Sequence, residues 1–357
     1  MNTLKRLATL HTSMTQQGLE AILITQAENR YYLSGFTGSA GYLIITTNAA
    51  ILATDFRYVE QVGRQAPDYD LRQITGDVAT WLPLILAELN IKELAFEAED
   101  LTVSRHNKLQ DSTRHLGIKL VATGNIVEKL RTIKEPGEIE LITRAVALAD
   151  AAMDYAASII QPGLTELALG WEIESFMRTN GSEALPFEVI VAAGPNSSLP
   201  HAQPSDRPIG PGEPIVIDIG ARIGGYASDL TRTLSAGQPE AELKNIYDIV
   251  LQAQVSAEEK ITAGKTGHEA DSFAREIITR AGYGDNFGHG LGHGLGLVTH
   301  EEPRLGPNST DQLQDNMVFT IEPGIYIPGW GGVRIEDTVV MKDGKISILS
   351  RARKGLS

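Results

Sequence analysis

The acidic residues that could do chemistry in this sequence lie inside apolar segments of strand length. Glu322 follows the run MVFTI, Glu336 lies within GGVRIEDTVVM, and Asp218 lies within VIDIG. Burying a carboxylate without a partner costs several kcal/mol. Arg334 or Arg304 could pair with one of the glutamates, but the acids outnumber such basic partners. The pattern therefore favours carboxylates that share metal ions over carboxylates held in salt bridges.

A predicted hairpin places a second aspartate near the first. Asp218 and Asp229 are eleven residues apart in EPIVIDIGARIGGYASDLTRTL, which has two strand-like halves around RIGG. A turn centred on Ile223 and Gly224 would place the two aspartates directly opposite each other, with their Cβ atoms ~5 Å apart. Two bare carboxylates at that distance repel each other, and aspartate is a poor strand former. Either one aspartate lies in the turn and the other caps an element, or a cation compensates the pair. The apolar neighbours of Asp218 favour the cation.

Three histidines lie on the glycine-rich segment GHGLGHGLGLVTHE, residues 288–301. His289 and His293 have the four-residue spacing of a helical zinc site. Glycine at every second position argues against a helix, because each glycine costs ~1 kcal/mol there. The segment is better interpreted as extended backbone packed closely against its surroundings. We expect at least one of these histidines to join the acids in a site.

Four carboxylates and an imidazole, in a chain without cysteine, indicate hard divalent metal ions. Mn²⁺ suits this donor set best, with Co²⁺, Fe²⁺ and Zn²⁺ as alternatives. Four acids suit a pair of ions ~3.5–4 Å apart, bridged by carboxylates and a hydroxide. Such a bridge lowers the pKa of water from ~15.7 toward ~7 and supplies a nucleophile at neutral pH. The predicted chemistry is metal-assisted hydrolysis of a substrate that these patterns do not identify.

The elements that must position these residues belong to a chain of 357 residues, a length that indicates two domains. We expect the first domain to cover residues 1–125 and to be an α/β layered domain, because short strands and helices alternate along it. An amphipathic first helix is expected from Leu4, Leu7, Leu10 and Met14. The other expected elements of this domain are strands at 21–25, 42–47 and 50–54 and helices at 78–89 and 101–110.

The second domain is expected to cover residues 126–357 and to begin its main helix near Pro136, where a missing N–H costs nothing. Ile139, Ile142, Val146, Ala149 and Met153 would form the apolar face of that helix. Further helices are expected at 164–179, 239–261 and 267–282, and strands at 187–193, 213–222, 226–234, 317–322, 333–341 and 346–350. The predicted fold class is therefore mixed α/β (α+β).

Composition excludes several classes of function. Hydrophobic residues make up 42% of the chain and charged residues 21%, as in ordinary globular proteins. The formal net charge is −14 and no Lys/Arg run could follow a phosphate backbone, so nucleic acid is not an expected partner. The apolar runs have strand length, so no membrane span is expected. The N-terminus has no sustained apolar stretch for a secretory signal, and with no cysteine in the chain we expect a cytoplasmic protein.

The motifs VIDIGA, SDLTRT, GHGLGHGLGLVTHE, TIEPGIY and GGVRIEDT occur in the order seen in the pita-bread metallopeptidases, and the chain resembles that family. Within it the sequence is most similar to the Xaa-Pro peptidases, prolidase and aminopeptidase P. The segments SGFTGSAGY and TDFRY resemble the creatinase-type N-terminal domain of those enzymes, so the resemblance covers essentially the whole chain. It implies a creatinase-like domain over residues 1–125 and a pita-bread catalytic domain with a curved, mainly antiparallel sheet over residues 126–357.

The resemblance implies a role for each candidate site residue. It implies two metal ions, with Asp229 and Glu336 bridging both and Glu322 also acting as a proton shuttle. The implied ligands are Asp218, Asp229, His293, Glu322 and Glu336. His201 and His300 would contact the scissile carbonyl and stabilise the oxyanion. His289, Tyr326 and Arg334 would line the substrate pocket.

The implied substrates are small peptides with proline at the second position, and the implied assembly is a homodimer. A bond to proline is a tertiary amide without an N–H, which calls for an apolar pocket around the ring. One alternative is methionine aminopeptidase, which generally lacks the N-terminal domain; creatinase has that domain but does not use the metal centre. A second alternative is a non-catalytic pita-bread binding protein, which the complete ligand set opposes. Prolidase and aminopeptidase P stay open, and they differ in the length of peptide they accept.

Overall fold

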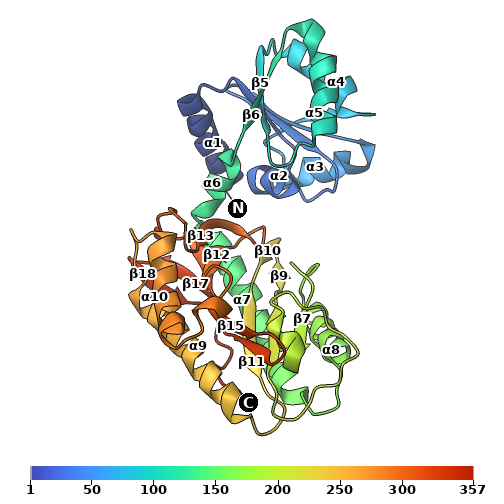
Figure 1. Ribbon diagram of the computed structural model, residues 1–357. Helices are drawn as coiled ribbons and strands as arrows, with labels where there is room; N and C mark the ends of the chain where they lie inside the picture. The colour runs from blue at the N-terminus through green and yellow to red at the C-terminus, as the bar shows by residue number, and fades with distance from the viewer. Residues whose placement is uncertain (1, 357) are drawn as a thin grey trace. The chain divides into compact units, whose positions relative to one another are not determined.

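The computed structural model describes residues 2–356 and contains two compact units, which divide between Arg131 and Thr132. No helix in the described part of the chain is long and apolar enough to cross a membrane. The two units are described separately below because each has its own sheets and core (Figure 1).

The first unit is a six-stranded mixed sheet with the strand order β4-β3-β2-β1-β5-β6. Its strands are β1 (Ala21–Ile24), β2 (Tyr42–Thr46), β3 (Ala50–Thr54), β4 (Asp70–Gln73), β5 (Glu93–Glu97) and β6 (Lys119–Thr123). Its helices are α1 (Thr3–Gln17), α2 (Ala27–Ser34), α3 (Val59–Gln65), α4 (Val78–Glu88), α5 (Val103–Thr113) and α6 (Ile126–Thr132). Strand β1 is buried along its whole length, and α4 and α5 pack on one face of the sheet (Figure 1).

The predicted elements of this unit lie within a few residues of those observed, but several were missed. Strands β4 (DLRQ) and β6 (KLVAT) occupy the sheet edges and are mostly exposed or half-buried, and each is too short and too mixed in polarity to show a buried-strand pattern. Helix α1 buries Leu10 and Met14 as expected, whereas Leu4 is exposed. Arg6 is buried in its place and stacks on the ring of Tyr32, 4.0 Å from the ring centroid.

The second unit consists of antiparallel sheets covered by four long helices. The helices are α7 (Pro136–Ile159), α8 (Glu166–Thr179), α9 (Ala241–Lys260) and α10 (Gly267–Arg280). The three-stranded sheet has the order β11-β8-β7, with β7 (Ile190–Ala193), β8 (Ile215–Ile219) and β11 (Leu230–Leu234). The five-stranded sheet has the order β13-β12-β14-β17-β18, with β12 (Gly292–Gly294), β13 (Glu301–Leu305), β14 (Val318–Ile321), β17 (Asp337–Lys342) and β18 (Lys345–Ile348). Two short ribbons complete the unit, β9 (Arg222–Ile223) with β10 (Tyr226–Ala227) and β15 (Gly324–Ile327) with β16 (Gly331–Arg334).

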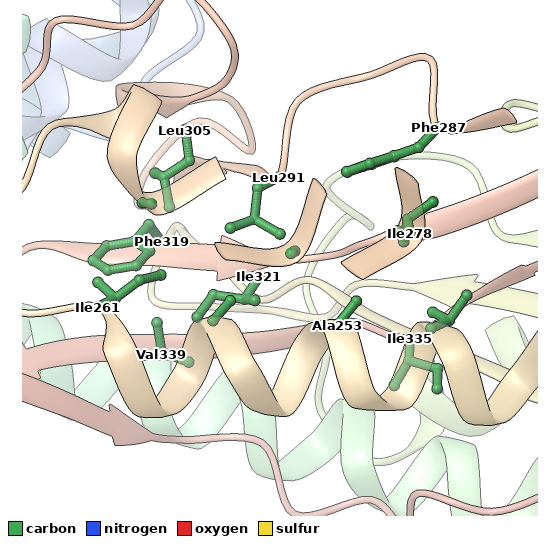
Figure 2. Close-up of a cluster of buried hydrophobic side chains, with 14 of the residues drawn as sticks. Ala253, Ile261, Ile278, Phe287, Leu291, Leu305, Phe319, Ile321, Ile335 and Val339 are labelled. Atoms are coloured by element: carbon green, nitrogen blue, oxygen red, sulfur yellow. The ribbon is translucent and has the colours of Figure 1, made fainter. Parts of the chain in front are cut away.

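Each of the two larger sheets is packed against its own pair of helices. Helices α7 and α8 share one buried apolar cluster with β7, β8 and β11, and α9 and α10 share another with β14 and β17. Figure 2 shows Ala253 of α9 and Ile261, which directly follows that helix, on the side of Phe319 and Ile321 of β14 and Val339 of β17. Because helices pack on one face of each sheet, the opposite face and the ends of the strands can carry a site.

The hairpin that carries the two aspartates has a different register from the one predicted. Asp218 is opposite Thr231, and the loop consists of Gly224 and Gly225. Both glycines have positive φ, +57° and +82°, which a two-residue turn of this kind requires and which glycine adopts without strain. The expected turn centre at Ile223 and Gly224 was wrong by one residue, so Asp229 lies diagonal to Asp218 rather than directly opposite it.

Candidate metal centre

Five side chains that lie on or next to five strands of the second unit line one cavity. Asp218 lies on β8 and His293 on β12, while Asp229 precedes β11, Glu322 follows β14 and Glu336 precedes β17. One ligand atom each of Asp229, His293 and Glu336 lies within 4.8 Å of the other two. Asp218 and Glu322 line the same cavity. The hydrophobic strands that follow or precede these acids explain how carboxylates come to be buried here.

The cavity, of about 830 Å³, contains every side chain that the sequence indicated for a site. These residues are His201, Asp218, Asp229, His289, His293, His300, Glu322, Tyr326, Arg334 and Glu336. Two of the acids are deeply buried, since Asp229 is 5% exposed and Glu336 only 1%. His201 and His300 are exposed, which places them at the accessible side of the cavity. The rings of His293 and His300 lie 4.1 Å apart between centroids and connect the two regions.

His293 and Glu322 form a close pair. His293 Nε2 lies 3.3 Å from Glu322 Oε1 and 3.7 Å from Asp229 Oδ2. Burial alone would lower the pKa of His293, but the hydrogen bond to Glu322 and its charge outweigh burial and raise the pKa to about 9. Burial would likewise raise the pKa of Glu322, and the hydrogen bond and charge of His293 instead bring it to about 2. Glu322 is therefore an ionised carboxylate.

At the other three carboxylates the effect of burial is the larger one, and their pKa values are raised. Burial and the charges of Glu336, Asp218 and Glu322 raise the pKa of Asp229 well above its usual range. Burial, followed by the charges of Glu322 and Asp218, does the same to the pKa of Glu336. The pKa of Asp218 is raised by burial, against the opposing charge of Arg334. Negative charge is thus crowded into a dry site, which is unfavourable unless a cation enters.

Arg334 provides one such cation and links both halves of the site. Its Nη2 donates to Asp218 Oδ2 at 2.7 Å, its Nε to Thr231 Oγ1 at 3.1 Å, and its Nη1 to the Tyr326 hydroxyl at 2.9 Å. Thr231 in turn donates to Glu336 Oε2 at 2.7 Å. The sequence pointed to a glutamate as the partner of Arg334, and the structure shows that the partner is Asp218.

His289 continues this chain of hydrogen bonds. Its Nδ1 is 2.8 Å from the carbonyl oxygen of Gly290 and its Nε2 is 2.9 Å from the Tyr326 hydroxyl. Burial lowers the pKa of His289, so the ring is neutral. A carbonyl only accepts, which places the proton on Nδ1 and leaves Nε2 to accept from Tyr326. The direction of donation is therefore from Arg334 to Tyr326 and from Tyr326 to His289.

The glycines of the histidine segment allow neighbouring strands, rather than the site itself, to approach closely. A Cβ atom on Gly292 would lie 2.0 Å from the carbonyl oxygen of Thr320 in β14. A Cβ atom on Gly294 would lie 2.1 Å from the carbonyl oxygen of Glu302 in β13. His293, between them, points to the other side of its short strand and enters the cavity. The glycines thus hold β12 tightly between two strands and fix the backbone of His293.

The donor set fits divalent metal ions on evidence from this structure. Carboxylate oxygens and one imidazole nitrogen converge, and Asp218 Oδ1 is buried without a hydrogen-bond partner. Among the described residues that line the cavity, Arg334 is the sole Lys or Arg side chain, whereas Asp218, Asp229, Glu322 and Glu336 all line it. Added positive charge would satisfy the orphaned oxygen and reverse the cause of the raised carboxyl pKa values.

Sequence reasoning missed the residues that hold the candidate ligands in place. Thr231 donates to Glu336, and Thr320 donates to Glu322 at 3.2 Å while accepting from the backbone N–H of His293. Thr231 follows Asp229 by two residues and Thr320 precedes Glu322 by two, so each shares a strand face with an acid. That alternation was a usable signal. Phe187 and Val189, which also line the cavity, fall within the strand predicted at 187–193, but the observed strand β7 begins at Ile190 and leaves them in an irregular segment.

Comparison with known proteins agrees with this arrangement. Residues 140–343 match metallopeptidase family M24, and residues 6–133 match the creatinase/prolidase N-terminal domain. An Xaa-Pro dipeptidase from Pyrococcus furiosus is 36% identical over 353 residues, covering 99% of each protein. The structure of an Xaa-Pro dipeptidase from Bacillus anthracis superposes with a TM-score of 0.96 at 40% identity, covering 99% of each chain. That of an X-Pro aminopeptidase from Thermotoga maritima gives a TM-score of 0.90 at 37% identity, covering 98% of each chain.

These matches confirm the predicted fold class, a mixed α/β protein with a creatinase-like N-terminal domain and a C-terminal metallopeptidase domain. The relatives span nearly the whole of this chain, and the family match alone covers more than half of it. The chain is therefore an enzyme of metallopeptidase family M24, with the creatinase/prolidase N-terminal domain preceding its catalytic domain.

Proposed function

We propose that this enzyme hydrolyses the peptide bond between an N-terminal residue and proline, using two divalent metal ions. The observation that carries the proposal is the convergence of four carboxylates and His293 in one cavity that also contains a polar chain through Arg334, Tyr326 and His289. Relatives named as Xaa-Pro dipeptidases and an X-Pro aminopeptidase support the choice of substrate.

The residues that would hold the metal ions are Asp218, Asp229, His293, Glu322 and Glu336. Asp229, His293 and Glu336 each offer a ligand atom within 4.8 Å of the other two, which is close enough to hold one ion. Sharing of Asp229 and Glu336 by both ions is what the family resemblance implies. The oxygen-rich set makes Mn²⁺ the first candidate, ahead of Co²⁺, Zn²⁺ or Fe²⁺. When bound, such ions supply Lewis acidity and lower the pKa of a water molecule from ~15.7 to ~7.

Glu322 is suited to move the proton that hydrolysis releases. It lines the cavity with its Oε1 3.3 Å from His293 Nε2, and a carboxylate at this place can accept a proton from the attacking water. The same carboxyl group can then give that proton to the proline nitrogen. The C–N bond breaks as that nitrogen is protonated, and proline leaves as a secondary amine.

His300 and His201 are suited to the developing negative charge on the carbonyl oxygen. Burial and the charge of His293 lower the pKa of His300, so its ring is a neutral hydrogen-bond donor. A donor aimed at the oxyanion contributes about 3–4 kcal/mol to transition-state stabilisation in well-studied hydrolases. His201 lies on the same accessible side of the cavity.

Proline specificity is supported by the apolar residues that line the cavity. Phe187, Val189 and Pro200 supply apolar surface near the histidines and Tyr326. Proline has no N–H to donate at the scissile bond, so recognition must come from packing on its ring and from contacts to the carbonyl side. A cavity lined by both apolar and polar side chains can provide both.

A panel of three peptides tests the proposal. Enzyme freed of metal with a chelator and reloaded with Mn²⁺ is incubated with Ala-Pro, Ala-Pro-Ala and Met-Ala-Ala, with Glu336→Gln as the inactive control. We expect cleavage of a proline peptide and none of Met-Ala-Ala. Cleavage of Ala-Pro alone identifies a dipeptidase, and cleavage of Ala-Pro-Ala identifies an aminopeptidase. Cleavage of Met-Ala-Ala alone contradicts the proposal in favour of methionine aminopeptidase, and cleavage of none favours a binding protein.

We further propose that the enzyme works as a homodimer in the cytoplasm. A dipeptidase must reject longer peptides, and the N-terminal domain of a neighbouring subunit would supply that restriction. Analytical ultracentrifugation at micromolar concentration should give twice the mass of 38.6 kDa. A species with the mass of one chain, 38.6 kDa, over the whole concentration range contradicts the dimer.

A further inference from the structure

We propose that Arg275 and Asp271 of helix α10 are positioning residues that hold His289 in its place on the cavity wall. Neither residue was singled out by the sequence, and neither belongs to the metal ligands. Their role in substrate binding rests on the proposed function, whereas their effect on the geometry of His289 does not.

Arg275 binds the backbone on both sides of residue 288. Its Nη1 donates to the carbonyl oxygen of Phe287 at 2.8 Å, and its Nη2 donates to the carbonyl oxygen of His289 at 2.6 Å. The guanidinium also lies over the Phe287 ring, 4.1 Å from the centroid. A planar guanidinium can make these parallel contacts simultaneously, which a lysine ammonium cannot.

Asp271 fixes the guanidinium and a third backbone group. Its Oδ2 accepts from Arg275 Nε at 2.6 Å, and its Oδ1 accepts from Arg275 Nη2 at 2.9 Å. Oδ1 also accepts from the backbone N–H of Leu291 at 3.0 Å. The Asp271 side chain is 2% exposed and that of Arg275 is 24% exposed, so water competes little for these bonds. Together the two side chains bind the chain before, at and after His289.

The contacts of Arg275 and Asp271 with residues 287–291, called the clasp below, determine the position of the His289 ring. The ring meets Phe287 edge-on, with centroids 5.1 Å apart and planes at 87°, and its Nε2 accepts from Tyr326. Asn286 completes the arrangement, because its side chain donates to the carbonyl oxygen of Tyr326 at 2.9 Å. Segment 286–291 therefore sets the position of both His289 and Tyr326. Without Arg275, the segment loses two of its side-chain anchors and the His289 ring loses its fixed distance to Tyr326.

The same helix offers a matched control. Arg280 and Glu276 form an ion pair with the same four-residue spacing, but their side chains are 74% and 66% exposed. Arg280→Met removes a pair of the same type from α10 without touching the clasp. Any effect of Arg275→Met that exceeds that of Arg280→Met belongs to the contacts with residues 287–291.

The first test compares kinetics and metal affinity in Arg275→Met, Asp271→Asn and Arg280→Met. We expect Arg275→Met and Asp271→Asn to raise KM for the cleaved proline peptide, by on the order of 10- to 100-fold for a misplaced substrate contact. The Mn²⁺ affinity, measured by titration calorimetry, should stay within about twofold, and Arg280→Met should match the unmodified enzyme. Unchanged KM, or Mn²⁺ affinity that falls together with kcat, overturns the proposal.

The second test uses no substrate, so it stands even if the enzyme does not cleave proline peptides. Imidazole ¹⁵N NMR of histidine-labelled protein should show His289 as the single Nδ1–H tautomer, assigned by its loss in His289→Gln. Arg275→Met or Asp271→Asn should convert this signal to an exchanging mixture, while Arg280→Met leaves it unchanged. A His289 signal that keeps its tautomer in both clasp variants overturns the proposal. If Arg275→Met does not fold, Asp271→Asn alone decides.

Discussion

Arg334 Nη2 and Asp218 Oδ2 are 2.7 Å apart, in an ion pair that is almost completely shielded from water. Asp218 is also a proposed metal ligand, and its second oxygen has no hydrogen-bond partner. Asp218 thus binds the Arg334 guanidinium with Oδ2, which leaves Oδ1 to bind a metal ion. The pairing explains how an aspartate can be kept in an apolar strand before a metal arrives.

Arg334→Met should destabilise the metal-free protein more than the metal-loaded protein. Breaking a buried ion pair leaves an uncompensated charge, which typically costs about 3–5 kcal/mol. Mn²⁺ would supply positive charge to Asp218 and recover part of that loss. Thermal unfolding in EDTA and in excess Mn²⁺ measures the difference. An equal loss of stability in both conditions would mean that Asp218 does not face the metal.

Asp229→Asn and Glu336→Gln should abolish stabilisation by metal without weakening the metal-free protein. Burial and neighbouring charges raise the pKa of both carboxyl groups, so a neutral amide of the same shape relieves a cost in the absence of metal. A ligand present at 100 times its Kd stabilises by about 2.7 kcal/mol, and the variants should lose that gain. Melting temperatures with and without Mn²⁺ test this. A normal Mn²⁺ shift in either variant would remove that residue from the ligand set.

His300→Ala should lose turnover while metal remains bound. Removing one oxyanion donor lowers kcat by about 10²–10³-fold in other hydrolases. Metal content of the purified variant, measured by mass spectrometry alongside kcat, separates the two roles. Loss of bound metal would identify His300 as a ligand instead of a substrate contact.

Glu258 should contribute a loss of stability to the metal-free protein between about pH 5 and pH 7, beside the loss from Asp218, Asp229 and Glu336, whose pKa values are also raised. Burial and the neighbouring Asp337 raise the pKa of Glu258 to about 7 from 4.5, against the attraction of Lys354. Since the folded state holds this proton more tightly, its contribution is full below pH 4.5 and is lost as pH rises through 7. Each unit of difference corresponds to about 1.4 kcal/mol.

Urea unfolding in EDTA at pH 5.5 and pH 8 measures this loss. Glu258→Gln cannot titrate, so its unfolding free energy should change less between the two pH values than that of the unmodified protein. The same pH dependence in both proteins would assign the loss to other groups.

The acidic residues of the cavity could be predicted from the sequence because each of them interrupts a local run of apolar residues. Asp218, Glu322 and Glu336 are acids with Val or Ile close by in the sequence. An acid in an apolar strand is unfavourable for folding, so its presence indicates a functional site. The long helix that begins at Pro136 was equally accessible, because its apolar spacing extends over six turns.

Features that depend on contacts between distant segments were not accessible in the same way. The hairpin register depended on whether Ile223 and Gly224 or Gly224 and Gly225 formed the loop, and this one-residue difference moved Asp229 relative to Asp218. The pairing of Arg334 with Asp218 joins residues 116 positions apart. Arg275 resembles any helix-surface arginine until the backbone of residues 287–291 lies beside it.

Anomalous X-ray diffraction from crystals of the Mn²⁺-loaded enzyme tests the central claim most directly. The account predicts two manganese peaks, enclosed by Asp218, Asp229, His293, Glu322 and Glu336, with Asp229 and Glu336 contacting both. A single peak, or peaks outside these five side chains in fully loaded and active enzyme, would contradict it.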